Sequence, residues 1–244
     1  MSGKGAILRS YRYATSLLEP AAAGLLLWRQ RRGKEDATRL AERRGHAGVK
    51  RPNKPLVWLH GASVGETVTL LPLIAKLQKR GFAVLVTSGT VTSAKLMAAR
   101  LPGGVIHQYI PLDVPRYMRR FMDHWRPDLC LICESEIWPN LLIEAQRRDI
   151  PVVMVNGRMS ERSFARWYKM PKTSRFLLSC FEACLAQSQG DAERLAQLGA
   201  PRVSVSGNLK FDVPAPPADP DTLAILDSQT TGRPVWIAAS THPG

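Results

Sequence analysis

The sequence lacks the long hydrophobic run and the leader pattern of many membrane and exported proteins. Its main N-terminal apolar stretch, Leu17–Trp28, is interrupted by Glu19 and Pro20. A transmembrane helix needs about 20 apolar residues, so this stretch is too short to be assigned as one. Arginines follow it where a signal-peptide cleavage site has small residues. A membrane-spanning segment and a cleavable signal peptide are therefore both disfavoured.

The chain has only four cysteines, and their spacing does not favour a zinc site. Cys130 and Cys133 lie in the apolar run DLCLIC, which is typical of a buried strand. In a strand an offset of three turns side chains to opposite faces, so these two thiols cannot grip one metal ion. Cys180 and Cys184 have no histidine nearby. We expect four free core thiols in a reducing compartment.

Several nucleotide and nucleic-acid signatures are also absent. No G-x-G-x-x-G follows the first apolar strand, and Ser88-Gly89-Thr90 follows the second, where a ribose-binding acid is expected. Measured binding of NAD or NADP would support a nucleotide-binding α/β enzyme of another class as the alternative function. The isoelectric point near 10.2 suits a basic protein that binds nucleic acid or anionic lipid. However, no helix-turn-helix, RNA-recognition or zinc-finger pattern is present, so no nucleic-acid partner is expected.

The basic charge is concentrated at the N-terminus. Acids are scarce, with 20 Asp and Glu against 34 Lys and Arg, and the net charge is +14. Residues 1–54 hold thirteen basic residues against four acids, so this segment carries +9 of that charge. An apolar helix flanked by arginines fits a segment that lies on an anionic membrane surface. The alternative is a helix packed on its own domain.

Past residue 54 the hydrophobic pattern alternates between strands and helices. Hydrophobic residues make up 45% of the chain, enough for a packed core. The apolar runs are nearly continuous, as in strands buried on both faces. Strands are expected at Leu56–His60, Ala83–Thr87, Val105–Ile110, Asp128–Cys133, Pro151–Asn156, Glu182–Ala186 and Arg202–Ser206. Helices are expected at Thr67–Arg80, Ser93–Arg100, Arg116–Trp125, Asn140–Arg148 and Asp191–Leu198. This order predicts an α/β fold with a Rossmann-like, doubly wound parallel sheet over residues 55–212.

A proline-rich linker is expected at residues 213–221, where four prolines fall within seven residues. A short helical pattern (Thr222–Asp227) and an apolar strand pattern (Pro234–Ala239) follow, and the sequence ends in STHPG. One strand cannot build a domain without a sheet to join. Residues 222–244 therefore read as the start of a second α/β domain.

Four polar segments follow predicted strands: GASVGE (61–66), ESEIWPN (134–140), NGRMSERS (156–163) and SGNLKFD (206–212). The carboxyl ends of parallel strands meet at one edge of a sheet, where α/β proteins bind ligands. Glu66 stands out as a lone acid at the start of a helix, with no apolar shield on the turn side. Each signal has a structural alternative: Glu134 as a helix N-terminal acid, Lys210 as a solvated lysine, and Ser160–Glu161 as a helix cap.

Together and in this order, the four segments resemble those of the 3-deoxy-D-manno-octulosonic acid (Kdo) transferases of Gram-negative bacteria. The resemblance extends from the N-terminal apolar and basic stretch to VWIAASTH near the end. It implies the N-terminal half of a GT-B glycosyltransferase, which has two Rossmann-like domains facing across a cleft. The family transfers Kdo from CMP-Kdo to the lipid A precursor (lipid IVA) in lipopolysaccharide biosynthesis. The resemblance places the protein at the cytoplasmic face of the inner membrane, with an anionic membrane surface as partner.

The resemblance also implies roles for individual residues. The general base falls on Glu66, and the transition-state stabilisers fall on Glu134 and Lys210. A positioned carboxylate takes the proton of a sugar hydroxyl as it attacks, and attack opposite the leaving group inverts the anomeric centre. No metal or cofactor is expected, and no Asp-x-Asp cluster is present. Additional acceptor contacts are expected from Ser63, Gly65, Arg158 and Arg162.

The nucleotide-binding segments of the family belong to the C-terminal domain, and the sequence ends before them. We therefore expect a truncated form that holds the acceptor half, with no transferase activity alone.

Overall fold

A computed structural model describes residues 6–214 and 218–239 of the chain. Its centre is a seven-stranded sheet in the order β3-β2-β1-β4-β5-β6-β7, in which all neighbouring strands are parallel. The strands are β1 (Leu56–His60), β2 (Ala83–Ser88), β3 (Ile106–Tyr109), β4 (Leu129–Cys133), β5 (Val152–Gly157), β6 (Ala183–Ala186) and β7 (Val203–Val205). The predicted α/β fold is confirmed.

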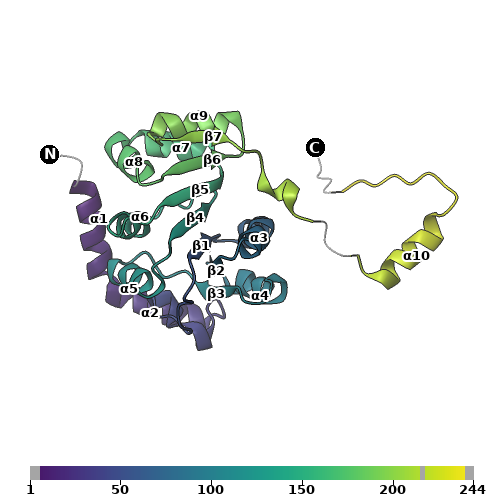
Figure 1. The fold of residues 1–244 in the computed structure, drawn as a ribbon, viewed down its shortest axis with the longest axis horizontal. Helices are drawn as coiled ribbons and strands as arrows, with labels where there is room; N and C mark the ends of the chain where they lie inside the picture. The colour runs from purple at the N-terminus through teal and green to yellow at the C-terminus, as the bar shows by residue number, and fades with distance from the viewer. Residues whose placement is uncertain (1–5, 215–217, 240–244) are drawn as a thin grey trace. The chain divides into compact units, whose positions relative to one another are not determined.

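Helices cover both faces of the sheet. Figure 1 shows α3 (Val64–Lys79) and α4 (Val91–Arg100) on one face, and α5 (Pro115–Trp125) and α6 (Pro139–Gln146) on the other. Helices α8 (Pro171–Leu178) and α9 (Gln189–Leu198) contribute side chains to the same apolar cluster as α5 and α6. Because the chain winds outward in both directions from β1 and β4, the fold is doubly wound, as expected.

Two apolar layers hold the helices to the sheet. Trp58 of β1 packs on Phe121 of α5, with ring centroids 4.7 Å apart, in the layer under α5, α6, α8 and α9. Leu70 and Ile74 of α3 pack in the layer on the opposite face. Cys130 belongs to the first layer and Cys133 to the second, so the two thiols of the C-x-x-C point to opposite faces, as predicted.

The predicted boundaries of the seven strands agree with the structure to within one residue at each end. Two helices were not predicted, α1 (Ala6–Leu17) and α8, and of α7 (Glu161–Tyr168) only the cap at Ser160–Glu161 was predicted. Proline begins α8, and α7 is only eight residues long, although its Phe164 and Trp167 pack against the core. The predicted strand over Pro234–Ala239 is wrong, since this segment forms no strand and Trp236 is 85% exposed. A strand needs a partner, and the described residues of this region offer none.

The N-terminal helices belong to the same compact unit as the sheet, which extends to Val213. Leu8 of α1 enters the core, while Tyr11 donates a hydrogen bond to Asp113 (2.9 Å) and Arg12 pairs with buried Glu144 at 2.8 Å. The adjoining helix α2 (Glu19–Arg31) buries only Leu26. Within the described residues, no helix has the length and apolar character needed to span a membrane.

The outer surface of α1 and α2 is nonetheless apolar. Large side chains are exposed there, namely Ile7, Tyr13, Leu17, Leu18, Leu25, Leu27 and Trp28. Arg32, which follows α2, stacks on the ring of Trp28 at 4.1 Å. One side of this segment therefore packs on the domain, as the alternative predicted, and the other faces outward. Contact with a membrane surface stays a prediction.

A second unit begins at Pro214 and contains α10 (Pro220–Thr230). Asp219 caps α10 by accepting a hydrogen bond from the backbone N–H of Thr222 at 2.8 Å. Residues 215–217 of the predicted linker and residues 240–244 at the end of the predicted second domain lie outside the described part of the chain.

Candidate active site

The candidate site lies where the strand order reverses. Strands β1 and β4 are neighbours, and the chain leaves them for opposite ends of the sheet. Glu66 follows β1 and Glu134 follows β4, so both acids lie at the carboxyl ends of the two strands that flank the switch point. In open α/β sheets this crevice is where ligands bind.

Glu66 is held by the turn that starts α3. Ser63 is the N-cap residue, and its hydroxyl accepts a hydrogen bond from the Glu66 N–H at 3.3 Å. One oxygen of Glu66, Oε2, accepts from the Ala62 N–H at 2.8 Å, in a variant of the capping box. Glu66 is only 8% exposed, so the expectation of an exposed acid is wrong. Its Oε1 has no hydrogen-bond partner among the described residues and remains free to accept one.

Gly61 explains why Glu66 is buried. A Cβ at this position would lie 3.0 Å from the N–H nitrogen of Thr67 and 3.1 Å from the Cβ of Glu66. The first turn of α3 therefore packs directly on the backbone at the end of β1. Gly65, in contrast, has open space around its Cα and is exposed, as is Ser63. Ser63 and Gly65 therefore remain candidates for contacts with the acceptor.

Glu134 has an unusual backbone conformation. Its φ is +59°, in the left-handed region that costs an L-residue about 1–2 kcal/mol. Its N–H donates to the carbonyl of Val155 at 3.0 Å, which holds this strained residue at the end of β4. Strain of this kind is concentrated at functional sites, where the surrounding structure maintains it.

Lys210 reaches the same place from a distant part of the sequence. It belongs to the 3-10 helix η3 (Leu209–Asp212), and its Nζ lies 3.7 Å from Oε1 of Glu134. The turn is anchored by Asn156, at the end of β5, whose side-chain oxygen accepts from the Leu209 N–H at 3.0 Å. Asn156 is fully buried and has a φ of +52°. We interpret Asn156 as the residue that positions Lys210.

A third acid, Glu136, was not predicted. The indole N–H of Trp138 donates to its Oε2 at 2.6 Å. The Trp138 ring in turn contacts the edge of His60, at 5.4 Å between centroids. His60 is fully buried, and burial lowers its pKa to about 4, so it is neutral at pH 7. The acid lies inside the ESEIWPN segment, and the alternation of two acids with an aromatic residue was the available signal.

The charges of these residues act on one another. Burial raises the pKa of Glu136, the Trp138 hydrogen bond opposes this effect, and the charges of Glu66 and Glu134 raise it further. Burial likewise raises the pKa of the Cys133 thiol, with added contributions from the same two acids and an opposing one from Lys210. We call Glu66, Glu134, Glu136 and Lys210 the switch-point cluster. It combines a carboxylate with a free oxygen, a strained acid and a lysine, which suits proton removal beside a developing positive charge.

Arg158 and Arg162 lie on the exposed side of the segment that follows β5. Between them, Ser160 caps α7 by accepting from the Ser163 N–H at 3.3 Å, so the helix-cap interpretation of Ser160 is confirmed. The structure does not join the two arginines to the switch-point cluster, and they stay candidates for acceptor contacts. In the described part of the chain, no group of three or more His, Cys, Asp or Glu side chains is placed to hold a metal ion.

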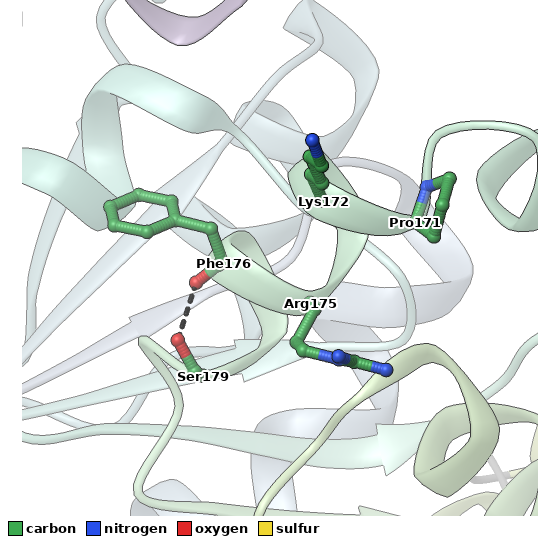
Figure 2. Close-up of a pocket in the computed structure, with 5 residues that line it drawn as sticks. All are labelled: Pro171, Lys172, Arg175, Phe176 and Ser179. Atoms are coloured by element: carbon green, nitrogen blue, oxygen red, sulfur yellow. Dashed lines mark hydrogen bonds between the residues drawn. The ribbon is translucent and has the colours of Figure 1, made fainter. Parts of the chain in front are cut away.

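An apolar hollow lies elsewhere, on α8. Figure 2 shows it lined by Pro171, Lys172, Arg175, Phe176 and Ser179, with a volume of about 490 Å³. The long side chains of Lys172, Arg175 and Phe176 point away from one another, and the Ser179 hydroxyl donates to the Phe176 carbonyl. Its polar groups do not converge, and none of the predicted site residues lines it. We do not assign a site there.

Comparison with known proteins agrees with the placement of these segments. The sequence profile of the family described as 3-deoxy-D-manno-octulosonic-acid transferase (kdotransferase) matches residues 38–213. This range includes the switch-point cluster and all seven strands. The chain belongs to the Kdo transferase family. The resemblance found from the four polar segments is therefore confirmed.

Curated Kdo transferases align over most of the chain. The Rickettsia bellii enzyme is 34% identical and covers 97% of this chain, and the Haemophilus influenzae enzyme is 36% identical and covers 84%. These alignments cover 57% and 50% of the two relatives, so the chain spans about half the length of the curated Kdo transferases it matches.

Solved structures of two-domain proteins resemble this chain over about half of their length. A putative UDP-N-acetylglucosamine 2-epimerase from Listeria monocytogenes superposes with a TM-score of 0.52, at 14% identity. The Staphylococcus aureus MnaA structure, solved with UDP, gives 0.51 at 15% identity. Each match covers 71% of this chain and about half of the other. At this identity only the fold is shared, and this Kdo transferase chain corresponds to one Rossmann-like half of a two-domain GT-B architecture.

Proposed function

We propose that this chain supplies the acceptor half of an inverting glycosyltransferase that transfers Kdo from CMP-Kdo to the lipid A precursor. The observation that carries the proposal is the switch-point cluster, in which four charged residues from three separate segments meet at the ligand edge of the sheet. Membership of the Kdo transferase family supports the reaction class. The fold supports a two-domain arrangement in which the second half binds the nucleotide.

In the proposed reaction Glu66 is the general base. A sugar hydroxyl is too weak an acid to ionise alone at neutral pH, so its proton moves to the carboxylate as attack proceeds. The hydroxyl oxygen forms a bond to the anomeric carbon of Kdo, and the bond from that carbon to the phosphate oxygen breaks. CMP leaves with the bonding electrons, and the anomeric configuration inverts. Because Oε2 already accepts the Ala62 N–H, Oε1 is the oxygen we assign to the proton.

Glu134 and Lys210 act on the charges that develop in this step. The anomeric carbon gains oxocarbenium character as the phosphate leaves, and the carboxylate of Glu134 stabilises it. Lys210 lies 3.7 Å from that carboxylate and is 49% exposed on the side chain, so its ammonium can also reach a ligand. Its role in the proposal is to stabilise the Kdo carboxylate or the departing phosphate. The acceptor contacts of Ser63, Gly65, Arg158 and Arg162 belong to the same proposal.

We also propose that the N-terminal helices hold the protein against an anionic membrane, at the cytoplasmic face of the inner membrane, where the lipid acceptor lies. The exposed apolar side chains of α1 and α2 and the arginines after them support this location.

The test compares this half of the enzyme alone with the same half joined to a C-terminal half. We expect the 244-residue chain alone to give no Kdo transfer from CMP-Kdo to the lipid A precursor. Joining residues 1–213 to the C-terminal half of the Haemophilus influenzae enzyme should restore it. In that chimera Glu66→Gln should lower turnover by at least about 100-fold, since the general base is lost. The control Glu193→Gln alters an exposed acid on α9 and should leave turnover unchanged.

Two results would refute the proposal. Retained turnover in Glu66→Gln would remove the base assignment. A chimera that folds and binds CMP but transfers no Kdo would show that this half does not present the acceptor.

A further inference from the structure

A cationic pocket lies apart from the switch-point cluster, with which it shares no residue. It has a volume of about 650 Å³ and is formed where α1 meets α2, where the chain leaves the 3-10 helix η2 (Glu42–Arg44), and along α5. Its lining includes Leu17, Glu19, Pro20, Arg44, His46, Arg116 and Arg120. All of these elements belong to the compact unit that ends at Val213.

Gly45 explains how η2 comes to lie so close to α5. This glycine ends η2 with a φ of +82°, and a Cβ at its position would lie 2.1 Å from the carbonyl oxygen of Tyr117. Both the backbone conformation and the contact require glycine. The close approach places Arg44 and His46, on either side of Gly45, over the arginines of α5.

The positive charge of the pocket is only partly compensated. Arg116 pairs with Glu19 at 3.4 Å, and its side chain is largely exposed. Arg44 and Arg120 have no carboxylate within ion-pair distance among the described residues, and the buried Nε of Arg44 has no hydrogen-bond partner there. With three arginines and one glutamate, the lining carries a net +2.

His46 adds no further charge. Arg120 donates to the carbonyl of Arg44 at 2.7 Å, and its guanidinium also lies 2.8 Å from Nε2 of His46. Burial lowers the pKa of His46, and the charges of Arg120 and Arg44 lower it further. The positive charge of the pocket therefore comes from its arginines and not from His46.

The charge of this pocket matches that of a phosphate group. A phosphomonoester carries about −1.5 to −2 at pH 7, which matches the +2 of the lining. Guanidinium groups bind phosphate oxygens with paired, charge-assisted hydrogen bonds. The neighbouring wall is apolar: Leu17 and Pro20 line the pocket, and Leu17 and Leu18 are more than half exposed beside it.

We infer that this pocket binds the phosphomonoester headgroup of a membrane lipid, whose acyl chains contact the apolar elbow of α1 and α2. The inference gives the proposed membrane contact a specific headgroup. It does not depend on the transfer reaction, since neither CMP-Kdo nor the switch-point cluster takes part.

The experiment measures binding of the 244-residue chain to two types of phosphatidylcholine vesicle with equal surface charge. One type contains phosphatidic acid, which is a phosphomonoester, and the other contains phosphatidylglycerol, which is a phosphodiester. We expect about tenfold tighter binding to phosphatidic acid, the ratio produced by one additional charge-assisted hydrogen bond. The double variant Arg44→Gln/Arg120→Gln should bring the ratio to about one. The matched variant Arg31→Gln/Arg32→Gln removes two charges outside the pocket and should weaken both affinities equally, with the ratio unchanged.

Arg116→Gln is the variant that tests the pocket without disturbing the fold, because its side chain is 68% exposed. This variant should lower the ratio of the two vesicle affinities, but less than the double variant does. Equal binding of the two vesicle types by the unaltered chain would overturn the inference, and so would an unchanged ratio in a folded Arg44→Gln/Arg120→Gln variant. If glycerol 3-phosphate bound as tightly as the vesicles, the ligand of the pocket would be a soluble phosphate, and the inference of a lipid headgroup would be overturned. A folded chimera that transfers no Kdo, while the 244-residue chain keeps the roughly tenfold ratio, would count against the proposed function alone.

Discussion

The left-handed backbone of Glu134 gives a prediction whose size can be worked out from the structure. A φ of +59° costs an L-residue about 1–2 kcal/mol, and glycine is free of this cost. Glycine loses more conformational freedom on folding, by about 0.5–1 kcal/mol relative to alanine. Glu134→Gly and Glu134→Ala both remove the acid and its ion pair with Lys210. We therefore expect the glycine variant to be more stable than the alanine variant by about 0.5–1 kcal/mol.

The assay is urea unfolding of the two variants at pH 7, followed by circular dichroism. Equal slopes with a higher midpoint for Glu134→Gly would show that the difference lies in folded-state strain. In the chimera with a C-terminal half, both variants should lose Kdo transfer alike. If glycine were less stable than alanine, as at an ordinary helix or strand position, Glu134 would not adopt the left-handed conformation and the argument for functional strain would fail.

Three further changes test other parts of the structure. The pKa of Glu136 is raised in the folded state, so ionisation of this side chain destabilises the fold as pH rises above the ordinary pKa of glutamate. The variant Glu136→Gln should therefore raise the urea midpoint at pH 7 and leave it unchanged at pH 3. Gly45→Ala should destabilise the chain by about 2 kcal/mol or more because its Cβ meets the carbonyl of Tyr117, whereas Gly24→Ala, an open helical position, should stabilise it by up to about 1 kcal/mol in the same urea assay. Asn156→Ala removes the acceptor that anchors η3, and should cost about 1–2 kcal/mol by the same measure.

The strands could be predicted because burial on both faces leaves a continuous apolar run, which is hard to mistake. Helices α4, α5 and α9 could be predicted because each presents one apolar stripe to the sheet. Helix α7 has an apolar period, at Phe164, Trp167 and Tyr168, but within only eight residues. Helix α1 is attached in part by polar contacts from Tyr11 and Arg12. Contacts between a distant helix and buried acids leave no local pattern in the sequence.

The candidate site was predicted at the level of segments. Strand ends locate Glu66, Glu134 and Lys210, but the sequence does not show how far each is buried. The expectation of an exposed Glu66 failed because it rested on the small residues of the turn. Those residues let α3 pack closely on β1, which covers the acid. The anchoring role of Asn156 depends on a contact across 53 residues, which only the fold reveals.

The charges of the two sites fit one kind of acceptor under the proposed function. The switch-point cluster has three carboxylates, which favour a neutral hydroxyl group beside Glu66, and one lysine, which is the group proposed to meet the anionic donor. The pocket between α2 and α5 carries the opposite net charge and attracts a phosphate. A lipid that presents both groups is therefore oriented by charge, with its hydroxyl towards Glu66 and its phosphate held apart from the base. Reversal of the pocket charge, as in Arg116→Glu/Arg120→Glu, should raise the KM for a phosphorylated lipid acceptor in the chimera and leave kcat unchanged. A fall in kcat at constant KM would show that the pocket acts on the chemical step, against this separation of roles.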